Sequence, residues 1–454
     1  MPMDGATGAD LDVRIAEWRA WLTRRGAAAP DVNALEEQLR SHAEDLALAG
    51  LSADEAFLIA ATRLASEDAL TRDWARGQQN SLVSRLLVAG DDSIRTTRRA
   101  MVVGLLFAVG AAIAVKLPAL FGLEPGEGTW YARNISLLVL PFLVGWLLWS
   151  RRASGVAIAT VGAFFAVAAV VANIYPFPRG TETSATEILL VVHLPVLLWF
   201  VVGLAHAGTR WRQSDARMDA VRFTGEWAIY FALIALGGGV LVGLSVAVFS
   251  AIRLEVEDVV VEWVLPFGAA GAVIVAALLV EAKRSVIGNI APVLTKLFTP
   301  LFALLLLAFL GAMAWTRTVD IDREVLIIFD LLLVVVLALA LFSMSARGPG
   351  APPGAFDRLQ LVLVVSALVV DAVGLSAMVS RIALWGPSPN KLVALGLNIV
   401  LFINLAWLAW MLLGFLRRRR THASLERWQM AYLPIYAAWA AIVVVVVPPV
   451  FGFA

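Results

Sequence analysis

Residues 356–420 read FDRLQLVLVVSALVVDAVGLSAMVSRIALWGPSPNKLVALGLNIVLFINLAWLAWMLLGFLRRRR. The stretch contains two long apolar runs, and the short turn Arg381–Lys391 separates them. The hydrocarbon layer of a membrane is about 30 Å thick, and about 20 apolar residues cross it as a helix. The stretch therefore predicts a helical hairpin that crosses a membrane twice.

Apolar runs of the same kind fill most of the chain, which is 60% hydrophobic and only 16% charged. A soluble protein of this length would carry more charge and fewer long apolar runs. Eleven candidate membrane spans are predicted, at residues 100–121, 134–150, 153–175, 186–208, 224–252, 260–280, 297–315, 325–345, 358–380, 391–416 and 429–448. The pattern predicts an all-α fold, a polytopic transmembrane helix bundle over residues 100–454.

Lysine and arginine residues near the ends of these spans predict the orientation, because basic loops preferentially stay in the cytoplasm. With a cytoplasmic N-terminus, 19 basic residues lie at the inner ends of the spans and eight at the outer ends. We therefore predict a multi-pass protein of a cytoplasmic membrane, with its N-terminus inside and its C-terminus outside.

Residues 1–80 differ from the rest of the chain, because they carry fourteen acidic and eight basic side chains and no long apolar run. Apolar residues at helical spacing predict four short helices, at about residues 10–25, 31–49, 52–64 and 66–76. Asp31 is expected to cap the second helix, and Ser52 and Glu55 form a capping box for the third. Residues 1–80 are predicted to form a small cytoplasmic helical domain, and residues 81–99 a polar tether.

Part of this domain, the stretch from Leu35 to Leu64 with its Gly-Leu-Ser-Ala-Asp-Glu-Ala core, resembles the permease-prefix domain found ahead of bacterial membrane proteins. The resemblance implies an intracellular interaction module without catalytic residues. A surface with six excess negative charges is repelled by an anionic membrane leaflet. We therefore expect a cytoplasmic protein partner for residues 1–80, and membrane lipid around the spans. A solvated helical cap without a partner is the alternative.

Two segments of the C-terminal half, Asn289–Phe302 and Arg381–Leu392, resemble a bacterial membrane family known as domain of unknown function four-one-five-three. The second segment is similar to that family's hairpin pattern at Arg381, Gly386, Ser388, Lys391 and Leu392. The resemblance implies a polytopic protein of the bacterial inner membrane, and it supplies no established activity.

Asp371 is the strongest candidate for a functional residue. It lies ten residues before Arg381, or about 15 Å along a helix, which places it near the middle of the membrane. An ionisable side chain at that depth is costly and usually marks a functional site. Asn398 and Asn404 lie at a similar depth on the next helix, so we expect hydrogen bonds from them to Asp371. A proton or cation relay or a substrate contact is one interpretation, and a hydrogen-bonded clasp between helices is the other.

Two further polar features belong to the membrane region. Asp330 is predicted near the outer end of its helix, where it could share a cluster with Arg323 or Arg381. The run Arg417–Arg420 is typical of an anchor at the inner side of the membrane, and binding of anionic lipid headgroups is the alternative.

Motifs for catalysis, cofactor binding and metal binding are not found in the sequence. The chain has no cysteine, and His193 and His206 are too far apart on one helix to bind one metal ion. A Gly-rich phosphate loop, a His-Glu-x-x-His motif and a Gly-x-Ser-x-Gly motif are also missing. We therefore predict no catalytic residue, no cofactor and no metal, and the lack of a basic patch with interleaved aromatic residues predicts no nucleic-acid partner.

Three functions fit these features. The first is a transporter or permease-like protein, in which polar residues near the middle of the membrane, led by Asp371, line a path. The second is a membrane sensor or assembly partner that docks a cytoplasmic protein through residues 1–80. The third, an intramembrane enzyme that acts on lipid, is the weakest, because no catalytic pair has a workable spacing. The sequence slightly favours the first and predicts neither a substrate nor an oligomeric state.

Overall fold

The structure of the protein is a computed structural model. It describes residues 29–48, 99–123, 129–178, 183–251, 254–283, 291–316, 323–345, 347 and 352–454, together with positions 12, 15, 16, 18, 19, 56, 57 and 59–61. The described residues form helices and turns and no strand. The chain divides into two compact units, Met1–Arg98 and Arg99–Ala454.

The main described helix of the N-terminal unit is α2 (Ala29–Leu48). The apolar core of this unit comprises Ile15, Trp18, Val32, Leu39, Ala43, Phe57, Ala60 and Ala61. Because α2 begins at Ala29, the prediction of Asp31 as its N-cap is wrong. Pro30 fits the first helical turn, where its fixed φ suits the helix and its missing N–H needs no partner. The predicted capping box at Ser52 and the predicted helix at 66–76 lie outside the described residues.

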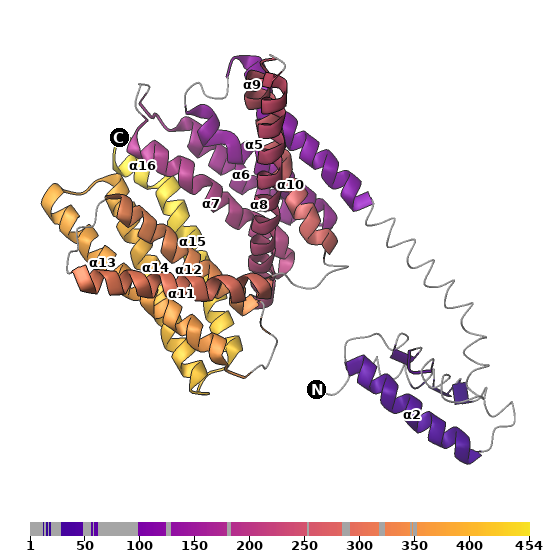
Figure 1. Cartoon of the computed structure of the whole chain (residues 1–454). Coiled ribbons are helices and arrows are strands. Elements are labelled where there is room, and N and C mark those ends of the chain that lie inside the picture. The colour runs from indigo at the N-terminus through magenta and orange to yellow at the C-terminus, as the bar shows by residue number, and fades with distance from the viewer. Residues whose placement is uncertain are drawn as a thin grey trace. The chain divides into compact units, whose positions relative to one another are not determined.

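The larger unit contains, among its described residues, 11 helices that are long and apolar enough to cross a membrane (Figure 1). They are the helix at residues 99–116 with the 3-10 turn η1 (Leu117–Phe121), α5 (Trp130–Ser150), α6 (Gly155–Ile174), α7 (Ala185–Ala207) with η2 (Gly208–Arg210), α8 (Ser214–Ala251), α10 (Leu265–Lys283), α11 (Ala291–Thr316), α12 (Arg323–Ser345), α13 (Ala355–Trp385), α14 (Pro389–Leu416) and α15 (His422–Val445). Short segments flank two of them: α9 (Glu257–Val259) and the π-helix η3 (Val260–Val264) precede α10, and α16 (Val447–Val450) follows α15. The predicted all-α polytopic bundle is confirmed.

The predicted spans and the helices differ most at two helix starts. α8 begins at residue 214, ten residues before the predicted span, and α15 begins at residue 422, seven residues before it. Both additional segments are amphipathic, so a search for apolar runs overlooks them. Their apolar side chains nevertheless pack into the bundle, as buried Met218, Phe223 and Leu425 show. Burial of one face of such a segment favours the helix over a polar loop.

Two apolar cores hold the helices of this unit together. The first core joins the helix at residues 99–116 with α5, α6, α7, α8 and α10, and the second joins α11, α12, α13, α14 and α15. Figure 1 shows the purple and magenta helices of the first group beside the orange and yellow helices of the second. α8 and α15 contribute to both cores: Phe223 and Val444 pack in the first core, and Met218 and Met430 in the second. The candidate polar residues lie in the second group.

Candidate functional site

Asp371 lies in α13, and its side chain is only 1% exposed. The neighbouring Ala367 and Val370 are buried in the second apolar core, so apolar groups surround the carboxyl group. A Cβ atom at Gly374 would lie 3.4 Å from Cδ2 of Phe329, an ordinary contact distance, so α12 and α13 meet at this point. The carboxyl group of Asp371 is therefore about one helical turn from a contact between the two helices.

Two further polar side chains reach the same place from neighbouring helices. Asp330 of α12 directly follows Phe329 and interacts electrostatically with Asp371. Asn398 of α14 is completely buried, and its amide lies near the carboxyl group of Asp330. Three helices thus bring together Asp330, Asp371 and Asn398, which we call the acidic cluster.

The acidic cluster has more hydrogen-bond acceptors than donors. Both oxygens of Asp371, Oδ1 of Asp330 and Oδ1 of Asn398 are buried and have no hydrogen-bond partner in the part of the chain that the structure describes. Nδ2 of Asn398 also lies 3.5 Å from Sδ of Met378, which is a weak acceptor. An unpaired buried polar atom costs about 1–3 kcal/mol. The cluster is therefore unfavourable unless it binds a hydrogen-bond donor or a cation.

This arrangement favours the binding of a positively charged species. Two carboxylates in an apolar interior lose their hydration and repel each other, and a proton or a bound cation removes both penalties. Among the described residues, no group of three or more His, Asp or Glu side chains is arranged to hold a metal ion. A single positive charge, either a proton or a monovalent cation, is enough to remove the repulsion between the two carboxylates. Asp330 is partly exposed, so it is the member of the cluster closest to the surface of the bundle.

Asn404 of α14 belongs to a different network, which is fully paired. Its Nδ2 donates to Oε1 of Gln429 at 2.9 Å and to the hydroxyl of Tyr436 at 2.7 Å. Its Oδ1 accepts from Nε1 of Trp428 at 2.9 Å and from Nε2 of Gln429 at 3.2 Å. These four residues, which we call the Asn404 network, join α14 to α15. The predicted hydrogen bond from Asn404 to Asp371 is therefore wrong, because Asn404 faces α15.

The other predicted residues are also grouped differently from the expectation. Asn398 lies near Asp330 and makes no hydrogen bond to Asp371, whose two oxygens have no hydrogen-bond partner within the described ranges. Asp330, expected beside Arg323 or Arg381, lies beside Asp371. Arg381 is ten residues further along α13 than Asp371, or about 15 Å along the helix axis. The side chain of Arg323 lies outside the described residues.

Sequence reasoning missed Gln429 and Tyr436, the partners of Asn404 on α15. Gln429 is the first residue of the predicted span at 429–448, where a polar side chain is typical of the membrane surface. Because α15 begins at residue 422, Gln429 lies two turns inside the helix, and it is 1% exposed. A buried amide needs partners. The signal that would have identified Gln429 is the presence of a second amide side chain at the depth of Asn404.

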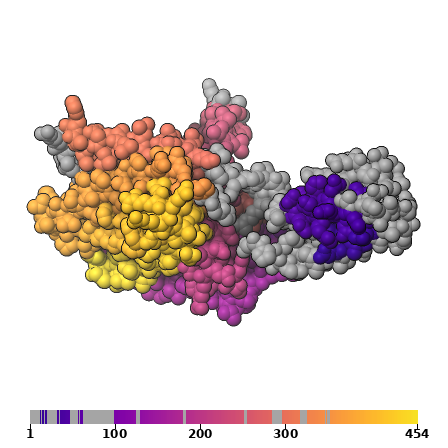
Figure 2. All heavy atoms as spheres, turned by 90° about the horizontal axis from the view of Figure 1, so that it is seen from below, coloured from indigo at the N-terminus to yellow at the C-terminus, as the bar shows by residue number. Residues whose placement is uncertain are grey.

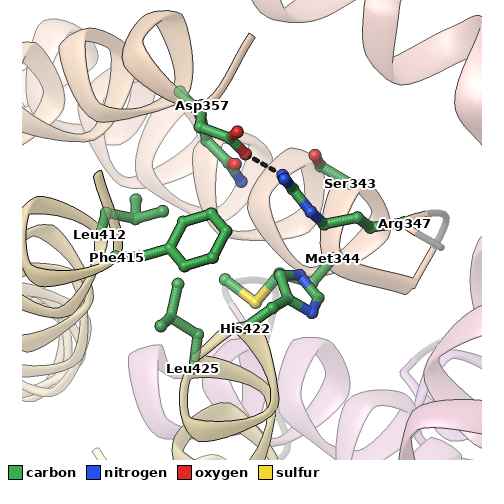
Figure 3. A pocket seen from close by; sticks show the side chains of 9 residues that line it. Ser343, Met344, Arg347, Asp357, Leu412, Phe415, His422 and Leu425 are labelled. Carbon is green, nitrogen blue, oxygen red and sulfur yellow. Dashed lines mark hydrogen bonds and ion pairs between the residues drawn. The ribbon is translucent and has the colours of Figure 1, made fainter. Parts of the chain in front are cut away.

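A second polar group joins α12 to α13 at the end of the bundle where α13 begins (Figure 3). Arg347 forms an ion pair with the buried Asp357. Asp357 also accepts a hydrogen bond from the backbone N–H of Gly354 at 2.7 Å, and Arg347 donates to the carbonyl of Pro352 at 2.7 Å. The guanidinium group lies 4.9 Å from the ring of Phe415, and the remaining cavity of about 10 Å³ holds one water molecule at most. This joint links Arg347 to Pro352 and to Asp357 in the first turn of α13, and it has no room for a larger ligand.

Comparison of the chain with protein-family models, with curated protein sequences and with solved structures found no match. The resemblances to the permease-prefix domain and to domain of unknown function four-one-five-three stay predictions. The acidic cluster is a candidate site because of the burial and pairing of its own residues.

Proposed function

We propose that the protein is a cation-coupled transporter of the permease type, in which the acidic cluster binds the coupling cation. The starting point is the bundle of 11 apolar helices, which makes the chain a multi-pass membrane protein. Buried carboxyl groups in such proteins are costly and usually serve the movement of ions or substrates. The observation that carries the proposal is that neither oxygen of Asp371 has a hydrogen-bond partner among the described residues.

Each member of the acidic cluster has a role in this proposal. Asp371 and Asn398 supply their free oxygens to the cation, and the partly exposed Asp330 is the group through which it enters and leaves. The three side chains come from α12, α13 and α14, so a bound cation links three helices. Cation binding then favours one packing of these helices over another, and a ligand that prefers one state shifts the population towards it. In this proposal, the shift couples the binding of the cation to the movement of a second solute across the membrane.

The proposal includes an orientation in the bacterial inner membrane, with the N-terminus in the cytoplasm and the C-terminus outside. Two observations support it. Basic residues are concentrated at one set of helix ends, 19 against eight. The described helices that are able to cross a membrane number 11, and an odd number of crossings leaves the two termini on opposite sides.

A sensor or assembly role is the second candidate function, and the separate N-terminal unit favours it. Residues 1–98 form a compact unit of their own. Some of its charges pair within the unit, as Arg40 does with Asp12 at 3.0 Å, but acidic side chains outnumber basic ones by six over residues 1–80. This excess suits a cytoplasmic protein partner with a basic surface. Deletion of residues 1–80 would abolish such docking and leave cation binding by the acidic cluster intact.

The test of the proposed function compares the wild type with Asp371→Asn and Asp330→Asn. Asp258→Asn is the control, because this carboxyl group is exposed in α9. The midpoint temperature of unfolding is followed by tryptophan fluorescence in detergent, in NaCl, KCl or choline chloride of equal ionic strength and at several pH values. We expect Na⁺, K⁺ or acidification to raise the midpoint of the wild type and of Asp258→Asn by several degrees, since a bound ligand stabilises the folded state.

Asp371→Asn should unfold near the wild-type temperature in choline chloride. Its midpoint temperature should not rise in the presence of the cation or the acid that stabilises the wild type. Equal responses of the wild type and Asp371→Asn would contradict the proposal. The choline measurement separates loss of binding from loss of folding, because a misfolded variant has a lower midpoint in every buffer.

A further inference from the structure

A second site lies in the loop between α14 and α15. Arg418, Arg419, Arg420, Thr421 and Ser424 line an open cleft of about 450 Å³. Three guanidinium groups and two hydroxyl groups therefore meet at one hollow of the surface. In Figure 2 the gold surface at this end of the two helices faces the viewer.

The backbone of this loop holds an arginine in a conformation that glycine usually adopts. Arg418 has a φ of 56°, in the left-handed region. Its N–H donates to the carbonyl of Phe415 at 2.9 Å, and the N–H of Arg419 donates to the carbonyl of Gly414 at 2.9 Å. These two hydrogen bonds end α14 in a Schellman motif. This backbone turns the chain sharply after α14, so that Arg418, Arg419 and Arg420 all line the cleft.

The turn between α5 and α6 has the same backbone and provides a comparison. Arg152 has a φ of 48° and takes part in the same pair of hydrogen bonds at the end of α5. Its neighbour Arg151 forms an ion pair with Glu281 at 3.0 Å. Ser154 caps α6 by accepting a hydrogen bond from the N–H of Ala157. The α5–α6 turn thus has both a carboxylate for its positive charge and a cap for its next helix.

Among the described residues, the α14–α15 loop has neither a carboxylate that pairs with its arginines nor a side chain that caps α15. None of Arg417–Arg420 forms an ion pair with a carboxylate of the described residues. Thr421, the residue before α15, makes no side-chain cap hydrogen bond, so the positive end of the α15 dipole also faces this loop without a capping oxygen. Several positive groups are therefore gathered in one cleft, and no carboxylate of the described residues pairs with them.

Arg420 is held in a defined position beside the apolar surface. Its guanidinium group lies 4.0 Å from the ring centre of Trp410. A Cβ atom at Gly414 would approach Cδ of Arg420 to 2.9 Å, so glycine makes room for the arginine along α14. Trp410 itself is 50% exposed, next to the similarly exposed Trp407. One wall of the cleft therefore borders an aromatic surface of the kind that lies at the level of lipid headgroups.

We propose that this cleft binds the phosphate of an anionic lipid headgroup. Guanidinium groups bind phosphate oxygens through paired N–H donors, and basic side chains at the end of a transmembrane helix contact headgroups of anionic lipids. The exposed ring of Trp410 beside Arg420 favours a lipid over a soluble phosphate, because the acyl chains pack on the aromatic surface while the phosphate enters the cleft.

The test titrates the purified full chain in detergent with phosphatidylglycerol or phosphatidylcholine and counts bound lipid by native mass spectrometry. Arg418→Gly is compared with Arg152→Gly. Both substitutions keep the left-handed backbone, because glycine adopts it readily, so the two variants differ in which guanidinium group is lost. We expect Arg418→Gly to weaken the apparent affinity for phosphatidylglycerol about fivefold and Arg152→Gly to leave it unchanged.

Two further arms complete the experiment. Arg419→Gln should weaken binding as Arg418→Gly does, and Arg419→Lys should restore part of it, which gives a result even if Arg418→Gly does not fold. Inorganic phosphate is added as a competitor to identify a soluble ligand. Equal affinity for the two lipids, equal losses in Arg418→Gly and Arg152→Gly, or displacement of the lipid by equimolar inorganic phosphate would each overturn the proposal.

Discussion

Asn398 and Asn404 lie six residues apart on α14 and both are completely buried, but their surroundings differ. The amide of Asn404 makes four hydrogen bonds to three side chains of α15. In the described part of the chain, Oδ1 of Asn398 has no hydrogen-bond partner, and neither do Oδ1 of Asp330 and the two oxygens of Asp371. One helix therefore carries a saturated polar network and an unsaturated one.

This difference separates a structural polar group from a candidate binding site. A fully paired network in an apolar interior holds two helices together and has no free atom for a ligand. A buried group with excess acceptors destabilises the fold until a cation or a proton binds, so its persistence is expected where function needs it. Burial alone does not distinguish the two cases, because both asparagines are completely buried. The balance of donors and acceptors does.

The largest effect on stability is expected from Asn404→Leu. The substitution leaves the amide of Gln429, the indole N–H of Trp428 and the hydroxyl of Tyr436 without their shared partner. Unpaired buried groups cost about 1–3 kcal/mol each, and hydrogen bonds between membrane helices lie at the weak end of this range. We therefore expect the free energy of unfolding to fall by about 2–4 kcal/mol. Titration with SDS in mixed micelles measures it.

The double variant Asn404→Leu/Gln429→Leu is the control for this expectation. Removal of both amides leaves fewer unpaired groups, so the double variant should lose less stability than the two single variants together. Losses that simply add would show that the two residues do not act as one network.

A smaller effect, of the opposite sign or zero, is expected from Asp371→Asn. The change replaces an unpaired buried carboxyl group by a neutral amide of the same shape. We expect the free energy of unfolding in choline chloride at neutral pH to stay the same or to rise by up to about 2 kcal/mol, in the same SDS titration. A clear loss of stability would instead indicate a structural partner for Asp371, and the contrast with Asn404 would disappear.

The membrane spans could be predicted from the sequence, whereas the grouping of polar residues could not. The length of an apolar run determines whether a helix crosses a membrane, and depth within the run was enough to select Asp371. The register of α12 against α13, in which Phe329 lies beside Gly374, is a property of packing between helices, and no pattern within one helix contains this information. Asp330 therefore lies near Asp371, although its position near a helix end predicts Arg381 as its neighbour.

The two asparagines illustrate the same limit. Six residues turn a helix by about 240°, so Asn398 and Asn404 point in different directions, which sequence reasoning could have calculated. Which direction meets α13 and which meets α15 depends on the packing of the bundle. Gln429 was overlooked for a related reason, because α15 begins before its apolar run and places this amide inside the membrane region.

The smallest effect on stability is expected from Asn398→Leu, which repeats on the same helix the chemical change of Asn404→Leu. Asn398 makes a weak contact to Sδ of Met378 at 3.5 Å, and the nearby Asp330 is partly exposed. We expect the free energy of unfolding to change by less than about 1 kcal/mol, while the stabilisation by cations or acid becomes weaker because one free oxygen is lost. A loss as large as that of Asn404→Leu would mean that both asparagines are structural, and the free oxygens beside Asp371 would then no longer indicate a binding site.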